Sequence, residues 1–310
     1  MKQKIVNWLI HSQMLLVVQA ILHPSRVWRY WHYKLSAKKP HVIKLEPTLK
    51  AIATKRMAVV RYGDGELRWM LDTDSYAFQH ASPQLAQRLK AILEAPAPKN
   101  CAICVPDVFN GLGQYVPQNQ DAWMALLGRY YASWQRYLLK QLQFYDANLS
   151  RFYIDRRDKN QAGVYFGLLT KIWAGRDVLI VEGTGTRLGV GNDLLASARS
   201  IRRIICPAEN AFNCYEEILS TVEQKVQPDD VVLIALGPTA TVLAYDLAKL
   251  NLQAVDIGHA DLEYEWYLQG ARDRVNIAGR YVNEIAGGQV VVPATTDEYN
   301  RQIIATIKGV

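Results

Sequence analysis

The chain has 310 residues, of which 50% are hydrophobic, and a formal net charge of +7. This composition predicts a globular protein with one large core and excludes a disordered chain. The charge is uneven, because residues 1–56 contain eleven Lys or Arg and the single acid Glu46. A nucleic-acid enzyme would carry its basic residues around the catalytic face, whereas here they precede the rest of the chain, so we expect no nucleic-acid partner.

The N-terminal leader, residues 1–40, is predicted to contain an amphipathic helix. Ile5 to Ser25 carries no formal charge, but polar residues interrupt its apolar pattern. It fits neither a spanning helix of about 20 apolar residues nor a signal peptide with a small-residue cleavage site. Pro24 should end the helix, and residues 26–34 then mix aromatic with basic side chains. We expect residues 1–39 to meet an anionic membrane surface; the alternatives are packing on the protein's own core or on a sister subunit in a homo-oligomer.

From Met57 onward, short apolar runs alternate with longer helical patterns, which predicts a mainly parallel α/β sheet with helices on both faces. The predicted strands are 57–62, 101–105, 177–182, 203–207, 231–236 and 252–257. The predicted helices are 83–94, 121–144, 162–173, 192–200, 213–224, 239–250 and 261–272. Residues 41–286 should form one domain, and residues 287–310 a tail with an edge strand and a short helix.

The first strand runs into a glycine turn with the sequence RYGDGE, residues 61–66, which we take as the centre of the site. Its glycines allow a tight turn, and Asp64 and Glu66 follow at the carboxyl end of the strand, where open α/β sheets bind ligands. Two hard oxygen donors one residue apart suit Mg²⁺ or Mn²⁺ together with a nucleotide diphosphate. The alternative is a polar turn with a solvated glutamate.

The cysteines include one C-x-x-C pair, which could indicate zinc or redox chemistry. The pair lies in a strand-like run, where residues three apart point to opposite faces and cannot share a metal. We therefore expect the cysteines to serve as small core residues, in a protein of the reducing cytoplasm. The cysteines are Cys101, Cys104, Cys206 and Cys214.

Residues 182–193, EGTGTRLGVGND, form a glycine-rich loop between a predicted strand and a predicted helix. The loop lacks the dinucleotide fingerprint, because three residues rather than two separate its second and third glycines, and it has no Walker A lysine. We expect its amides to approach a ligand, Arg187 to pair with phosphate, and Asn192 or Asp193 to cap the next helix. A loop without a ligand is the alternative.

Two further strand ends carry candidate groups. Gly237 and Pro238 lead into a predicted helix that starts with Thr239. The unsatisfied backbone amides at the start of this helix suit a phosphate; the alternative is a plain helix cap.

His259 follows the last predicted strand. Together with the acids that follow it, at 261, 263 and 265, it is a candidate general base, metal ligand or sugar-hydroxyl partner, and the alternative is a structural histidine. Residues 151–155 and 207–212 give weaker signals for nucleoside or acceptor contacts.

Five sequence blocks, in this order, resemble the GT-D-type glycosyltransferases, long catalogued as a domain of unknown function. The resemblance covers roughly residues 45–285, so the basic leader lies outside it. The blocks are RYGDGE at 61–66, RLGVGND at 187–193, CPAENAF at 206–212, GPT at 237–239, and DIGH at 256–259 with EYEW at 263–266.

The resemblance implies a Rossmann-like fold, a nucleotide-sugar donor that is usually a UDP-sugar, and a D-x-E motif that helps to hold Mn²⁺ or Mg²⁺ and the diphosphate. The implied function is metal-dependent glycosyl transfer, which we expect at the inner face of the cell membrane, to a cell-surface glycan, glycolipid or glycoprotein. The alternatives are a membrane-bound scaffold and another Rossmann-type nucleotide-dependent enzyme.

The candidate residues follow from these blocks. Asp64 and Glu66 are the expected metal ligands. The expected catalytic residues are Asp64, Glu66, His259 and Glu263. The expected nucleotide-sugar-binding residues are Arg61, Gly63, Gly65, Gly183, Arg187, Asn192, Asn210, Gly237, Pro238 and Thr239.

Overall fold

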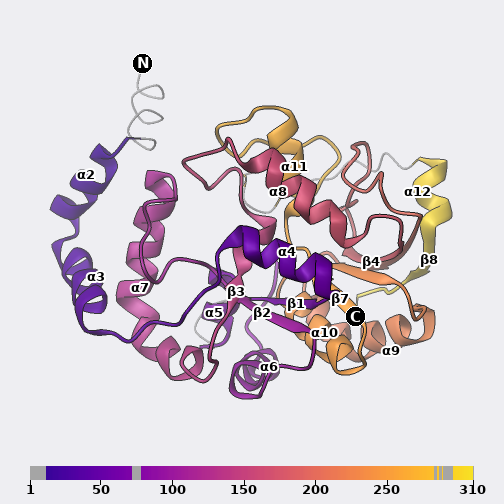
Figure 1. Cartoon of the computed structure of the whole chain (residues 1–310), viewed down its shortest axis with the longest axis horizontal. Coiled ribbons are helices and arrows are strands. Elements are labelled where there is room, and N and C mark those ends of the chain that lie inside the picture. Colours follow the sequence, from indigo (N-terminus) through magenta and orange to yellow (C-terminus); the bar gives the residue numbers. More distant parts are fainter. Residues whose placement is uncertain (1–11, 72–77, 283–284, 286–287, 289–295, 310) are drawn as a thin grey trace.

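The computed structural model describes residues 12–71, 78–282, 285, 288 and 296–309. These residues form an eight-stranded sheet in the order β3-β2-β1-β7-β6-β4-β5-β8, and all the strand pairs are parallel (Figure 1). The predicted fold class is therefore confirmed. The strands are β1 Ala58–Arg61, β2 Cys101–Val105, β3 Tyr145–Asp146, β4 Asp177–Gly183, β5 Ser200–Cys206, β6 Val231–Ala235, β7 Gln253–Asp256 and β8 Ile303–Thr306.

Helices cover both faces of the sheet. In Figure 1, α4, α8 and α11 lie on one side of it, and α6, α9 and α10 on the other. The helices are α2 Met14–Leu22, α3 Pro24–Ser36, α4 Leu45–Lys55, α5 Asp64–Trp69, α6 Pro83–Glu94, α7 Pro117–Leu138, α8 Ala162–Leu169, α9 Tyr215–Lys225, α10 Pro238–Lys249, α11 Ala260–Leu268 and α12 Asp297–Gln302. Short 3-10 helices lie at Ala147–Ser150, Thr170–Ile172 and Ala211–Cys214.

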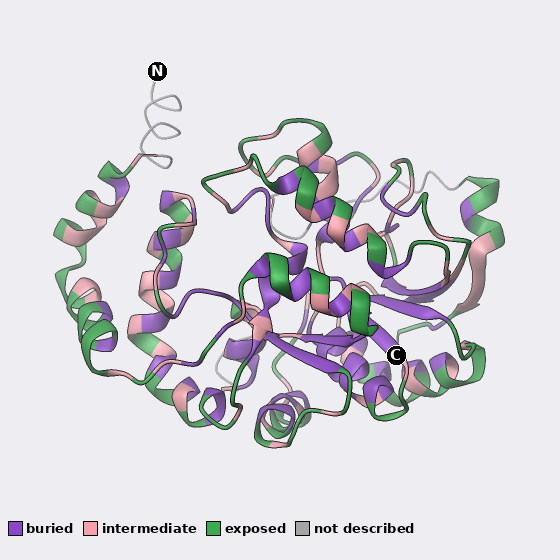
Figure 2. Ribbon diagram, viewed as in Figure 1, coloured by how far each residue is buried: buried purple, intermediate pink, exposed green. Residues whose placement is uncertain are grey.

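The strands are apolar on both faces because each face packs against helices. Val60 belongs to the core that includes α6 and α10, and its neighbour Val59 belongs to the core that includes α4 and α8. Figure 2 shows the central strands as buried ribbon between these layers. Cys101 and Cys104 lie in different cores, as their spacing predicted, and all four cysteines are buried and free.

The helix predicted at 192–200 is wrong, because this segment forms turns before β5. Two of its carbonyl groups are bonded to residues outside the segment: Trp173 Nε1 donates to Leu194 O at 3.2 Å, and Gly175 N donates to Ser197 O at 2.7 Å. These tertiary bonds replace the i to i+4 bonds that a helix would need. In the tail, the short helix α12 and the edge strand β8 agree with the prediction; residues 289–295 lie outside the described part.

In its described part, residues 12–40, the N-terminal leader forms two helices where one was predicted. The predicted helix is present as α2, but its first part, residues 1–11, lies outside the described residues. α2 ends before Pro24, as expected, and Pro24 then begins α3, because proline is tolerated in the first turn of a helix. Among the described residues, no helix combines the length and the apolar composition that crossing a membrane requires.

Candidate functional site

A cavity of about 500 Å³ opens at the carboxyl ends of the strands. Arg61 at the end of β1, Gly183 at the end of β4 and Gly258 after β7 all line it. From β1 the chain first extends the sheet through β2 and β3, and it later returns through β6 and β7 to the other side of β1. Such a reversal of strand order is where open α/β sheets bind their ligands.

The D-x-E turn separates its two carboxylates. Asp64 is the first residue of α5, and its side chain is exposed and lines the cavity. Glu66 is buried, and its Oε2 accepts a hydrogen bond from Gly63 N at 2.7 Å, which closes the first turn of the helix. Burial raises the pKa of Glu66, and the positive charge of Arg61 opposes this shift. Asp64 is thus the exposed carboxylate of the motif at the cavity, and Glu66 shapes the turn that carries it.

Arg61 is held beneath this turn by Asp256. Its Nη2 lies 3.4 Å from Asp256 Oδ1, and Thr241 Oγ1 donates to the Arg61 carbonyl at 3.0 Å. Burial raises the pKa of Asp256 to about 7, and Arg61 acts in the opposite direction. Gly258 has φ +51°, and a β-carbon there would overlap the Arg61 guanidinium. The site therefore keeps a cation beside the D-x-E turn.

His259 faces a group of arginines. Arg151 Nη2 contacts His259 Nδ1, and Asp155 pairs with both Arg151, at 3.5 Å, and Arg274, at 2.5 Å. Burial, together with the charges of Arg151, Arg61 and Arg274, holds the pKa of His259 well below its usual value. The imidazole is therefore neutral. Because a guanidinium can only donate, Nδ1 accepts and the ring proton resides on Nε2. In this tautomer His259 is a hydrogen-bond donor at Nε2, and its use as a general base stays a prediction.

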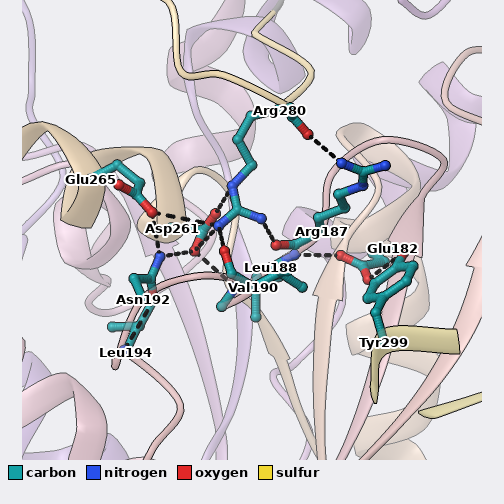
Figure 3. A network of polar contacts seen from close by, with 12 residues as sticks. Glu182, Arg187, Leu188, Val190, Asn192, Leu194, Asp261, Glu265, Arg280 and Tyr299 are labelled. Carbon is teal, nitrogen blue, oxygen red and sulfur yellow. Dashed lines mark hydrogen bonds and ion pairs between the residues drawn. The ribbon is translucent and has the colours of Figure 1, made fainter. Parts of the chain in front are cut away.

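The glycine-rich loop is held by buried ion pairs (Figure 3). Glu182 accepts from Leu188 N at 2.7 Å and pairs with Arg203 at 2.6 Å. The buried Arg187 donates to Gly279 O at 3.2 Å and does not line the cavity. Arg187 therefore joins the loop to the segment that contains Gly279.

Asp261 joins the loop to α11. Its Oδ1 accepts from Gly189 N at 2.8 Å and from Asn192 Nδ2 at 2.9 Å, while Oδ2 lies 3.1 Å from Arg280 Nε (Figure 3). Asn192 also donates to Glu265 at 2.8 Å, and it is not part of the cavity wall. Since no helix begins here, neither Asn192 nor its neighbour caps one. Asp261 itself does line the cavity.

Four other candidates lie outside the cavity wall. Glu263 is fully buried and accepts from the backbone N–H groups of Tyr153 and Ile154, at 2.7 and 3.1 Å. The Asn210 side chain accepts from His80 N at 2.8 Å, and the Asn210 backbone N–H donates to Phe78 O at 2.9 Å. These two side chains hold segments of the wall. The other two, Pro238 and Thr239, are buried in the first turn of α10.

Of the fourteen residues that we expected to be catalytic or to bind the nucleotide sugar, the structure brings eight to the cavity. They are Arg61, Gly63, Asp64, Gly65, Glu66, Gly183, Gly237 and His259. It adds an aromatic pair, Trp69 and Phe78, whose ring centroids are 5.5 Å apart, and a wall from α7 that includes Gln118, Asn119 and Trp123. No short motif marks these additions. The helical period of α7 shows that one face is apolar, but it does not show what that face meets.

The sheet topology and the cavity define a Rossmann-like α/β protein with a candidate ligand site at the ends of its strands. The chain belongs to the family of the glycosyltransferase GT-D fold, whose family model matches residues 59–285.

Solved structures of similar proteins include a new glycosyltransferase from Streptococcus sanguinis, with 35% identity and a TM-score of 0.83 over 87% of this chain and 100% of that chain. Another is the highly conserved domain of unknown function 1792, described as having a distinct glycosyltransferase fold, with 35% identity and a TM-score of 0.81 over 91% of this chain and 100% of that chain.

Two curated relatives are also similar. The probable glycosyl transferase Gly of Streptococcus gordonii is 36% identical over 86% of this chain. The glycosyltransferase GlyD of Streptococcus pneumoniae serotype 4 is 35% identical over 85% of this chain. The chain spans 39% and 32% of the lengths of these two relatives.

Proposed function

We propose that this protein is a metal-dependent glycosyltransferase that moves a sugar from a UDP-sugar to an acceptor hydroxyl. The observation that carries the proposal is that the exposed Asp64 carboxylate and the Arg61 guanidinium line the same cavity, in a chain of the GT-D family. A carboxylate and a guanidinium at one edge match the two requirements of a metal-bound diphosphate, which are an oxygen ligand for the cation and a donor for phosphate oxygens.

The donor set fits Mg²⁺ or Mn²⁺ with few protein ligands. Within the described ranges, no group of three or more His, Cys, Asp or Glu side chains is arranged to hold a metal ion. Mg²⁺ commonly takes one or two carboxylates and completes its shell with water and substrate phosphates, so Asp64, supported by Glu66, would suffice. When bound, the cation would supply stabilisation for the negative charge of the departing diphosphate.

The chain's own residues would share the remaining tasks. Arg61 offers a fixed cation to the diphosphate, and Gly237, at the start of α10, brings a helix N-terminus to the cavity. Trp69 and Phe78 give the cavity apolar surface suited to a base or a sugar face. His259 would donate a hydrogen bond from Nε2. The attacking hydroxyl would release its proton to one of the carboxylates that line the cavity, which are Asp64, Glu66, Asp155 and Asp261.

The proposed acceptor is a cell-surface glycan, glycolipid or glycoprotein, and the proposed place is the cytoplasmic side of the cell membrane. The support is the basic N-terminal segment, which contains eight Lys or Arg and no acid before Glu46.

Release of UDP from a panel of UDP-sugars tests the proposal, in the presence of Mn²⁺ and again with chelator. We expect release from at least one donor, which the chelator abolishes. Absence of release from every donor, together with absence of UDP binding, would overturn the proposed chemistry.

A further inference from the structure

The N-terminal arm, α2 and α3, exposes two apolar stripes. Each stripe has the spacing i, i+3, i+7, which places its side chains on one side of a helix. The α3 stripe includes Trp28, which is 68% exposed, and Leu35, which is 82% exposed. The stripes are Met14, Val17 and Ile21 on α2, and Trp28, Trp31 and Leu35 on α3. Figure 1 shows the arm at the edge of the molecule, beside α7 and away from the sheet, and Figure 2 shows its exposed outer side.

The other side of α3 is already bound to the body of the protein. The buried Tyr33 donates to Phe109 O at 2.7 Å, and its ring packs edge-on against Tyr131 on α7, with 4.6 Å between centroids. A β-carbon on Gly128 of α7 would lie 3.0 Å from the backbone of Tyr30, so the two helices are in close contact. The exposed α3 stripe is therefore not the face by which α3 joins the core.

Basic side chains accompany the exposed stripes. Arg29, Lys34 and Lys38 are exposed, and Lys34 Nζ lies 4.7 Å from the centre of the Trp31 ring. Tryptophan beside lysine and arginine is typical of the boundary between lipid headgroups and acyl chains. Each basic residue near an anionic bilayer adds favourable electrostatic energy.

We propose that the exposed side of the arm docks on an anionic phospholipid bilayer, with the two apolar stripes at the acyl boundary and the basic side chains among the headgroup phosphates. A second copy of the chain fits this surface less well. In a two-fold contact the same patch meets itself, and the sequence has no acid before Glu46 to offset the repulsion between basic residues. The inference does not depend on the transfer reaction.

Co-sedimentation of the full chain with vesicles tests this proposal. We expect binding to vesicles of phosphatidylcholine mixed with phosphatidylglycerol, and at least about tenfold weaker binding to phosphatidylcholine alone. Trp28→Ser, Trp31→Ser and Leu35→Ser combined should weaken binding to the anionic vesicles about tenfold or more, because the apolar stripe is lost. The matched control is Leu142→Ser, which changes a leucine that is 98% exposed outside the arm and should leave binding unchanged.

A second variant tests the charges. Arg29→Gln, Lys34→Gln and Lys38→Gln combined should reduce binding to anionic vesicles to the level of phosphatidylcholine. Equal binding of the wild-type chain to both kinds of vesicle would overturn the proposal. The proposal would also be overturned if the chain bound neither kind of vesicle and formed a dimer that the stripe substitutions dissociate. Unchanged far-ultraviolet circular dichroism and unchanged UDP binding would show that the variants are folded.

Discussion

Neighbouring charges determine what His259 can do. Arg151 contacts its Nδ1, so we expect a neutral ring with its proton on Nε2. His259→Gln places an amide N–H near the position of Nε2 and should keep UDP release within about tenfold of wild type, whereas His259→Ala should lose roughly 100-fold because the donor is gone. The acidic limb of the pH–rate profile should be the same in wild type and His259→Gln. Equal inactivity of both variants would identify His259 as a base.

Glu263 makes the folded state sensitive to pH. Burial raises its pKa from 4.5 to about 7, and the charge of Asp155 acts in the same direction. Between these pH values the unfolded chain releases the proton while the folded chain keeps it. The free energy of unfolding therefore falls as pH rises, by up to about 1.4 kcal/mol per unit, and this contribution is fully lost above about pH 7.

Glu263→Gln should remove the part of the pH dependence of the free energy of unfolding that comes from this carboxyl group. Its amide oxygen still accepts from the two backbone N–H groups, but the side chain cannot ionise. Urea unfolding between about pH 4.5 and 7 measures the slope in both proteins. We also expect the variant to retain UDP release, since Glu263 lies outside the cavity wall. A variant whose free energy of unfolding falls with pH as steeply as that of wild type would contradict this account. So would a variant that is folded but inactive.

The turn after β7 fixes Arg61. Gly258→Ala would drive a methyl group into the guanidinium and displace it from Asp256. The control is Gly270→Ala, because Gly270 has a similar φ of +62° but open space around it. We expect the control to lose about 1 to 2 kcal/mol of stability from backbone strain alone, and Gly258→Ala to lose more and to bind UDP roughly tenfold more weakly. Equal effects of the two substitutions would show that Arg61 is not held by this contact.

Strands were easier to predict than the site. The central strands are continuous apolar runs, because both faces are covered, and such runs are visible in the sequence. The segment 192–200 also has a helical pattern, but the carbonyls of Leu194 and Ser197 accept hydrogen bonds from residues 173 and 175, and no local pattern shows these contacts. The D-x-E motif predicted the position of the turn. The different orientations of Asp64 and Glu66 depend on the hydrogen bond from Gly63 N to Glu66, which is visible only in the three-dimensional structure.

At the scale of the whole molecule, the arm and the cavity are separate. No residue before Arg61 is among those described as lining the cavity, yet α3 covers Tyr131 on α7. Deletion of residues 1–39 should therefore lower the thermal midpoint by roughly 5 °C or more, because aromatic surface on α7 is uncovered, while UDP binding persists below that midpoint. Calorimetry and thermal unfolding check both parts. Loss of UDP binding by a folded truncated chain would contradict the separation.

The central claim is that Asp64 presents its carboxylate to a metal-bound diphosphate. Titration calorimetry of UDP with Mn²⁺, and again with chelator, tests it most directly in wild type, Asp64→Asn and the control Asp229→Asn, an exposed aspartate outside the cavity. We predict that wild type and Asp229→Asn bind UDP only with Mn²⁺, and that Asp64→Asn binds more than about tenfold more weakly. Wild-type affinity in Asp64→Asn, or equal binding with and without Mn²⁺, would contradict the account.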